Sequence, residues 1–181
     1  MEQNNDGQKF VLSKIKLLPG GGVRADYQTS IVIGEEVSVR DYTVCSDNIP
    51  HPDLTGLFDA LRPIVLKTFG LGALMDMSEE GGELYTDLLN RLNVHGLSWS
   101  GNGDTSGIVV SAVFETVSGS KSALNTPHIK FARASYGFEE ELEAITNQIK
   151  DEAYKYLFEG KQAQLSLFGE EPKEAEGLYA E

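Results

Sequence analysis

The residues most suggestive of a binding chemistry form a short apolar run near the C-terminus, Gln164-Leu165-Ser166-Leu167-Phe168. The run lies within an acidic stretch punctuated by glycine and proline, and such a stretch is expected to stay disordered. Exposed leucine and phenylalanine gain nothing from water, so a disordered tail normally lacks them. The run therefore indicates a ligand for another molecule's surface. The alternative is that its apolar side chains fold back and complete the protein's own core.

The same five residues resemble the bacterial sliding-clamp-binding motif, whose consensus is Gln-Leu, then usually Ser or Asp, then Leu-Phe. The match is complete, and a chance match in a chain of this length is on the order of a few in a thousand. In that family the glutamine occupies a small polar subsite and the Leu-Phe pair fills a hydrophobic pocket. The resemblance implies that Gln164 sets the register, Leu165 adds contact, and Leu167 and Phe168 anchor the peptide on a sliding clamp.

A second candidate site consists of basic residues in predicted strands. They are Lys14, Lys16, Arg24, Lys121, Lys130 and Arg133. Four aromatic residues lie near them in sequence: Tyr27, Tyr42, Trp99 and Phe131. Proteins that bind single strands combine a cationic groove with aromatic stacking platforms, and a sheet can display both. The set therefore predicts a surface for single-stranded DNA, with a solvated sheet face over core aromatics as the alternative.

Signatures of catalysis and of metal binding are missing from the sequence. His51, His95 and His128 are far apart, and none has a second ligand at helical spacing. The chain has no nucleophile elbow, Walker loop or dinucleotide fingerprint. Its single cysteine, Cys45, is expected to be a small core residue within a strand. We therefore expect a protein that is not an enzyme and that has no catalytic residues, metal site or cofactor.

The charge balance limits the classes of partner. The 181 residues carry a net charge of −13, and residues 159–181 account for −4 of it, which leaves −9 on the rest. A body of this charge repels phosphate backbones on average, so nucleic-acid binding requires a local basic patch. No apolar run approaches the roughly 20 residues that span a bilayer, and the N-terminus is polar and acidic. We expect a cytoplasmic protein of a bacterium or of a phage-infected bacterial cell, with no membrane partner.

The hydrophobic pattern predicts two β regions separated by helices. Alternating apolar residues predict strands over 9–18, 23–33 and 37–44, joined by tight turns. Asp53 is expected to cap a helix that begins at Leu54. The remaining expectations are a loop over 73–82, a short helix over 83–92, strands over 94–99, 108–117 and 123–132, and a long helix that follows residues 135–137.

This pattern gives an α+β fold class, with a mainly antiparallel sheet, a helical insertion, a long C-terminal helix and a disordered acidic tail. Whether the sheet closes into a barrel stays open at this point. The expected domain organisation is a flexible N-terminus over 1–8, one domain over 9–159 and an acidic tail over 160–181 that carries the peptide motif. No internal repeat of fixed period is visible.

The body of the chain also resembles uncharacterised phage and prophage proteins, in stretches such as Ile49–Leu54 and Tyr154–Lys161. This resemblance implies a role in phage DNA metabolism. The combined prediction is a non-enzymatic accessory of DNA replication or recombination that binds single-stranded DNA and is recruited to the sliding clamp by its tail. The alternative is an acidic interaction protein that blocks the host clamp groove without binding DNA.

Overall fold

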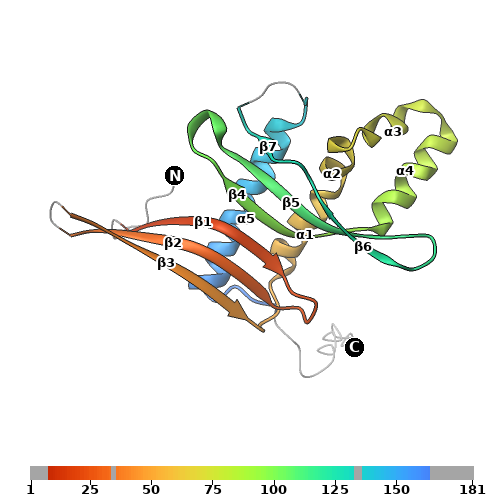
Figure 1. The fold of residues 1–181 in the computed structure, drawn as a ribbon. Helices are drawn as coiled ribbons and strands as arrows, with labels where there is room; N and C mark the ends of the chain where they lie inside the picture. Colours follow the sequence, from red (N-terminus) through yellow and green to blue (C-terminus); the bar gives the residue numbers. More distant parts are fainter. Residues whose placement is uncertain (1–7, 34–35, 133–135, 164–181) are drawn as a thin grey trace, which may run out of the picture.

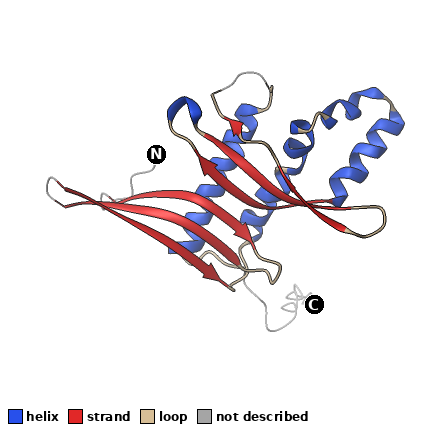
Figure 2. Cartoon of the chain, in the orientation of Figure 1, coloured by secondary structure: helices blue, strands red, loops and turns tan. Residues whose placement is uncertain are grey.

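The computed structural model describes residues 8–33, 36–132 and 136–163. It consists of two layers, with one antiparallel sheet and a set of helices that cover one of its faces (Figures 1 and 2). The helix α5 (Glu139–Phe158) runs behind the sheet beside α1 (Pro52–Ala60). The expected α+β class with a mainly antiparallel sheet and a long C-terminal helix is confirmed.

The strands match the expected ones in number and order, with one of them divided in two. They are β1 (Gln8–Leu17), β2 (Val23–Ile33), β3 (Glu36–Ser46), β4 (Leu92–Ser100), β5 (Gly107–Glu115), β6 (Lys121–Asn125) and β7 (Ile129–Lys130). The segment between β3 and β4 contains α1, α2 (Arg62–Thr68), a short 3-10 helix (Leu71–Ala73), α3 (Leu74–Met77) and α4 (Glu79–Arg91).

The sheet is open, so it does not form a barrel. Its strand order is β3-β2-β1-β4-β5-β6, and β7 pairs with β5 beside β6. The two three-stranded meanders join where β1 and β4 pair, in the register Lys14↔Ser98, Ile15↔Leu97 and Lys16↔Gly96. Ile15 and Leu97 are almost fully buried, so this narrow central pairing lies directly over the core.

The two halves of the sheet repeat one another in structure, although no repeat is visible in the sequence. Each half is an antiparallel meander followed by helix, and the first strands of the two meanders pair at the centre. A register shift follows Leu12 in β1, and the matching shift follows Val94 in β4. Since both central strands carry a bulge at the equivalent place, each strand twists sharply there and changes which residues face the helices.

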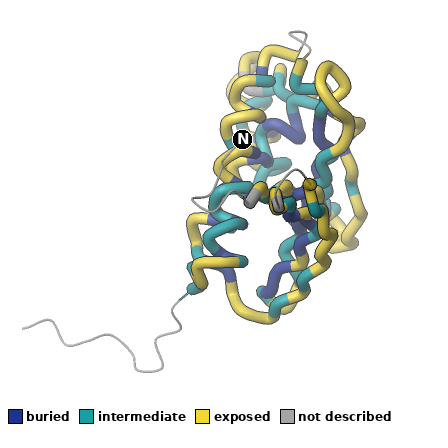
Figure 3. The backbone as a smooth tube through the Cα atoms, turned by 90° about the vertical axis from the view of Figure 1, so that its left-hand side faces the viewer, coloured by how far each residue is buried: buried dark blue, intermediate teal, exposed yellow. Residues whose placement is uncertain are grey.

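The core lies between the sheet and the helices. In β2, Val23, Ala25, Tyr27 and Thr29 are buried while the residues between them are more exposed, which is the alternation that the sequence predicts. Helix α5 contributes Leu142, Thr146, Ile149, Ala153 and Tyr156 as its buried stripe. Figure 3 shows the buried residues gathered where helices and strands face one another.

Two local expectations in the helical insertion are wrong. Residues 73–82 were expected to form a loop, but they form α3 and the first turn of α4, where the Ser78 side chain accepts a hydrogen bond from the Gly81 N–H at 3.1 Å. Helix α1 begins at Pro52 instead of Leu54, because His51 caps it: its Nδ1 accepts from the Asp53 N–H at 3.2 Å. An imidazole nitrogen thus takes the role usually filled by a carboxylate or hydroxyl oxygen.

The strand expected over 123–132 is interrupted between β6 and β7. Pro127 has no N–H to donate to the sheet, so regular pairing stops beside it. The buried Thr126 repairs the gap, because its hydroxyl accepts a hydrogen bond from the Val110 N–H at 3.0 Å and its own N–H donates to the Val110 carbonyl at 3.0 Å. One side chain therefore satisfies a backbone donor that the proline leaves without a strand partner.

Replacing Thr126 with valine should lower the free energy of unfolding by about 1–3 kcal/mol, since the buried Val110 N–H then has no acceptor. Thr126→Ser keeps the hydroxyl, so its free energy of unfolding should fall distinctly less. Urea denaturation of the two variants measures the difference. Equal losses in both would show that the methyl group, and not the hydrogen bond, stabilises this site.

Candidate functional site

The face of the sheet opposite the helices, called the open face below, collects the predicted basic residues. Strand register places them there, because residues that face one another across an antiparallel pair lie on the same side. Lys14 pairs with Asp26, Lys16 pairs with Arg24, and the buried Ile15 between them faces the helices. Lys14, Lys16 and Arg24 are therefore neighbours at the centre of the sheet.

The surroundings of these three cations are small and polar. Lys16 lies across Gly96: a Cβ atom built on this glycine would come within 3.1 Å of the lysine Cγ and within 3.3 Å of the Ser111 Cβ. Asp26 is partly exposed and accepts a hydrogen bond from the Thr43 hydroxyl at 2.8 Å, while the Arg24 Nε lies 3.9 Å from it. The aspartate therefore offsets part of the positive charge of the cluster.

The other predicted cations are more dispersed. Lys121 pairs with Glu115 and Lys130 pairs with Gly107, so both take open-face positions, at opposite ends of β5. Eight residues along a strand separate these ends by about 26 Å. Arg133 lies outside the described residues. Lys9, which the sequence reading missed, pairs with Ser30 on the open face, because the bulge after Leu12 reverses the alternation.

The aromatic residues expected to accompany these cations point away from them. Tyr27 and Tyr42 face each other on the helix side of the sheet, with ring centroids 5.3 Å apart. Trp99 and Phe131 pack against the core, and the Lys150 Nζ lies 5.4 Å from the centre of the Trp99 ring. None of these four rings can stack with a base on the open face. The open face thus offers charge and small polar groups for binding, and these aromatics serve the fold.

The histidines and the cysteine do not form a site together. Among the described residues, no group of three or more His, Cys, Asp or Glu side chains could hold a metal ion. His51 is the helix cap, and burial together with the charge of Lys16 lowers the pKa of His95. Cys45 was expected in the core, but it is exposed on the open face opposite Arg24. Side chains alternate along β3, so the inward position of Val44 turns the neighbouring Cys45 outward.

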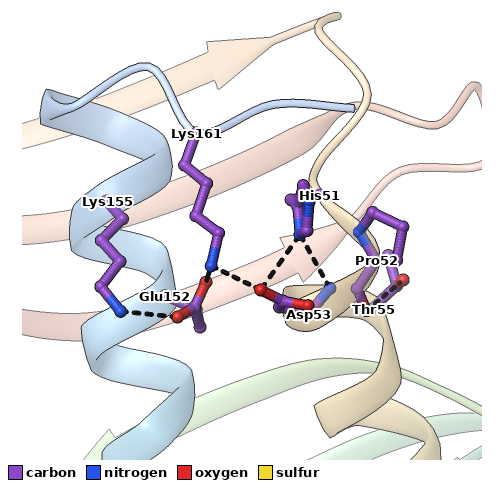
Figure 4. Close-up of polar contacts among 7 residues, drawn as sticks. All are labelled: His51, Pro52, Asp53, Thr55, Glu152, Lys155 and Lys161. Atoms are coloured by element: carbon purple, nitrogen blue, oxygen red, sulfur yellow. Dashed lines mark hydrogen bonds and ion pairs between the residues drawn. The ribbon is translucent and has the colours of Figure 1, made fainter. Parts of the chain in front are cut away.

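The predicted motif Gln164–Phe168 lies outside the described residues, whereas the segment that leads to it is held firmly against the domain. Gly160 takes a left-handed conformation (φ 70°) after α5 and turns the chain back. The Lys161 Nζ then lies between two carboxylates, 2.5 Å from Asp53 Oδ2 and 2.6 Å from Glu152 Oε2 (Figure 4). Glu152 also accepts from Lys155 at 2.8 Å. We call this network of Asp53, Glu152, Lys155 and Lys161 the tail anchor.

The ionisation of the tail anchor follows from these contacts. The hydrogen bond from Lys161 lowers the pKa of Asp53, and the same contact raises the pKa of Lys161. Burial acts to raise the pKa of Glu152, but the hydrogen bonds from Lys155 and Lys161 outweigh it and lower that pKa overall. All four groups are therefore charged near neutral pH, and the charged forms are the ones that hold the network together.

Backbone contacts fix the next two residues. Gln162 forms a bridge with Pro50, and the Ala163 N–H donates to the Ile49 carbonyl at 2.9 Å. A small hollow beside this point is lined by residues 51–52 and 160–163. Tyr156 secures the same loop, because its hydroxyl donates to the Asn48 carbonyl at 2.5 Å. Residues 161–163 of the expected tail thus contact the domain, and Gln164 follows directly on a fixed residue.

Comparison with known proteins gives no assignment: no protein-family model, curated protein or solved structure matches the chain. Within the part of the chain that the structure describes, no helix is long and apolar enough to cross a membrane. The candidate sites are therefore defined by the residues and contacts described above.

Lys161→Met should loosen the tail anchor, because it removes both ion pairs that close the turn after α5. We expect the hydrogen-exchange protection of the Ala163 N–H to fall by up to about tenfold at neutral pH, as two partly exposed pairs of this kind contribute modestly. Lys155→Met is the matched control, since it leaves the two contacts of Lys161 in place. An equal effect of both substitutions would contradict the assigned role of Lys161.

The protection should also depend on pH in a defined direction. The pKa values of Asp53 and Glu152 are lowered in the folded protein, so their stabilising effect is present near neutral pH and is lost as the pH falls below about 4. The Lys161→Met variant should show a smaller loss over this range. Hydrogen exchange compared between pH 7 and pH 3, corrected for intrinsic rates, measures this difference.

Proposed function

We propose that the protein is a non-enzymatic accessory of DNA replication or recombination that docks on a bacterial sliding clamp through Gln164–Phe168. The observation that carries this proposal is the complete five-residue motif in an otherwise acidic, polar tail. An extended peptide gains affinity by inserting terminal apolar side chains into pockets while a polar group fixes the register. Leu167 and Phe168 are the anchors and Gln164 is the register residue.

The position of the motif defines how docking would work. Because Ala163 is hydrogen-bonded to Ile49, almost no free chain separates the domain from Gln164. A motif at the end of a long linker would let the domain diffuse around the clamp. Here the short link would instead keep the domain next to the clamp surface. The short link would therefore restrict where the domain lies on the clamp, and it would also raise the effective concentration of the domain there.

The open face supports a contact with nucleic acid. Lys14, Lys16 and Arg24 form its centre, and the described strands place six cations and three carboxylates on this face of a protein with a net charge of −13. Charge of this kind contacts phosphates and carries no base preference. With the neighbouring aromatics turned inward, binding to single-stranded DNA would rest on phosphate contacts alone, so it would be weak and strongly salt-dependent.

The same inward turn of the aromatics is the observation that favours the alternative, an acidic protein that occupies the clamp groove and excludes other clamp ligands. Such a protein requires the motif but not the open face. The two functions differ in one property, since the accessory binds the clamp and DNA while the blocker binds the clamp alone. Measuring both affinities on the same preparation separates them.

Clamp binding should depend on the two apolar anchors. Leu167→Ala with Phe168→Ala should weaken binding by at least about a hundredfold, because loss of one such anchor often costs 2 kcal/mol or more. Ser166→Ala, at the tolerant position, is the control and should bind within about threefold of the natural sequence. Isothermal titration against a bacterial sliding clamp measures both, and unchanged binding by the double variant would refute clamp docking.

The fold of these variants must be checked, because back-packing of the motif is the competing explanation. A version that ends at Ala163 keeps the tail anchor and is the appropriate truncation. If the motif is a ligand, this version and the double variant should unfold at the same temperature as the full chain. A clear loss of thermal stability in both would identify the Leu167 and Phe168 side chains as part of the core.

DNA binding should be specific to the open face. Lys16→Gln should reduce the affinity for a single-stranded oligonucleotide and lower the slope of log affinity against log salt by about 0.7, which corresponds to one phosphate contact. Lys67→Gln is the matched control, because Lys67 lies on the helix side, paired with Glu141 at 3.1 Å. Fluorescence anisotropy at several salt concentrations measures both slopes. If the protein does not bind the oligonucleotide even at low salt, the DNA-binding function is refuted and the clamp-blocking function is favoured.

A further inference from the structure

The strand β3 forms one edge of the sheet, and no described element pairs with its outer side. It is 11 residues long and contains no proline or glycine. The opposite edge is blunted, because β6 has five residues and Pro127 follows it. A long regular edge presents a row of N–H and C=O groups to which another strand can pair. The exposed edge of β3 is therefore available to pair with another strand.

The first half of β3 is complementary to itself. Its sequence is Glu36-Val37-Ser38-Val39-Arg40, with opposite charges at the two ends and valines on both sides of a serine. If a second copy pairs antiparallel with Ser38 opposite Ser38, then Glu36 faces the second Arg40 and Val37 faces the second Val39. Each of these contacts occurs twice by symmetry. Neither charged side chain has an ion-pair partner among the described residues.

Exposed valines lie along the same half of β3. Val37 and Val39 are 61% and 55% exposed, and together with Val32 (61%), which pairs with Val37, they form an apolar patch on the open face. A monomer gains nothing from exposing three β-branched apolar residues side by side. In the Ser38-centred register, the patches of two copies meet, and cross-strand pairs of apolar and of opposite charge both stabilise sheet pairing.

We propose that two copies of the protein associate through the β3 edge, by antiparallel pairing of residues 36–40 about Ser38. Two other registers are less favourable, because a centre at Asp41 opposes two aspartates and a centre at Arg40 opposes two arginines. The twofold axis is perpendicular to the sheet, so the open faces of both copies lie on the same side and their basic residues form one surface. The pairing is short, and the dimer is accordingly weak and concentration-dependent.

The first test concerns the two charge pairs. The dissociation constant of the dimer is measured for the full chain by analytical ultracentrifugation, from about 5 to 500 µM. Arg40→Glu and Glu36→Arg should each raise the dissociation constant by about tenfold, because each replaces two attractive contacts by two repulsive ones. The double variant Glu36→Arg with Arg40→Glu restores complementarity, so it should dimerise like the natural sequence. Failure of the double variant to recover dimerisation, with unchanged thermal stability, would overturn the register.

Cross-linking provides the second test. Ser38→Cys, made in a Cys45→Ser background, places two thiols opposite each other on the axis and should give a covalent dimer under mild oxidation. Asp41→Cys in the same background is the control and should cross-link far less. Preferential cross-linking at Asp41 would contradict the proposed register. A monomeric natural chain at 500 µM, with cross-linking at neither position, would overturn self-association altogether.

Discussion

The pairing of β1 with β4 is the contact on which the rest of the molecule depends. It comprises three residue pairs, yet it joins the two meanders into one sheet and places Ile15 and Leu97 over the core. Because side chains alternate along a strand, the register that turns these two inward turns Lys14 and Lys16 outward. The hydrophobic core and the basic centre of the open face are thus two consequences of one register. A slip by one residue would expose the apolar pair and bury the lysines, so the arrangement of charge is protected by the cost of disrupting the core.

The pairing of β1 with β4 also explains why an acidic protein can have a basic face. Helices carry much of the negative charge, as in the first turn of α5, where Glu139, Glu140 and Glu141 lie at the positive end of the helix dipole. The helices α1 and α5, which follow the two meanders, pack beside each other on one side of the sheet (Figure 1). Most described carboxylates therefore lie away from the open face, where cations outnumber carboxylates by six to three. Net charge alone describes neither surface, and binding is governed by the local arrangement.

The sequence was most informative where periodicity is regular. Alternation predicted β2, and the spacing of apolar residues predicted α5 as a long helix. The same alternation places Tyr27 and Arg24 on opposite faces of the strand, so Tyr27 cannot stack with a base that is bound beside Arg24. The bulges after Leu12 and Val94 could not be read, since an extra residue reverses the alternation without any local signal. The bulge after Leu12 hid Lys9 from the basic set. The β1–β4 pairing itself joins segments about 80 residues apart, and strand order of this kind depends on long-range packing.

The β3 edge about Ser38 and the tail anchor lie at opposite ends of β3, so the two proposed interactions do not compete. Ser38 lies near the start of this strand, while the loop that holds Ala163 follows its last residue, Ser46. Eight residues of extended chain separate these points by about 26 Å. A second copy paired about Ser38 therefore leaves the tail anchor uncovered, and each copy would present its own motif. Since the open faces lie on the same side in this pairing, two weak phosphate-binding surfaces would act as one. Linking two weak sites raises the overall affinity far above that of either, which is how a face without stacking groups could still hold a single strand.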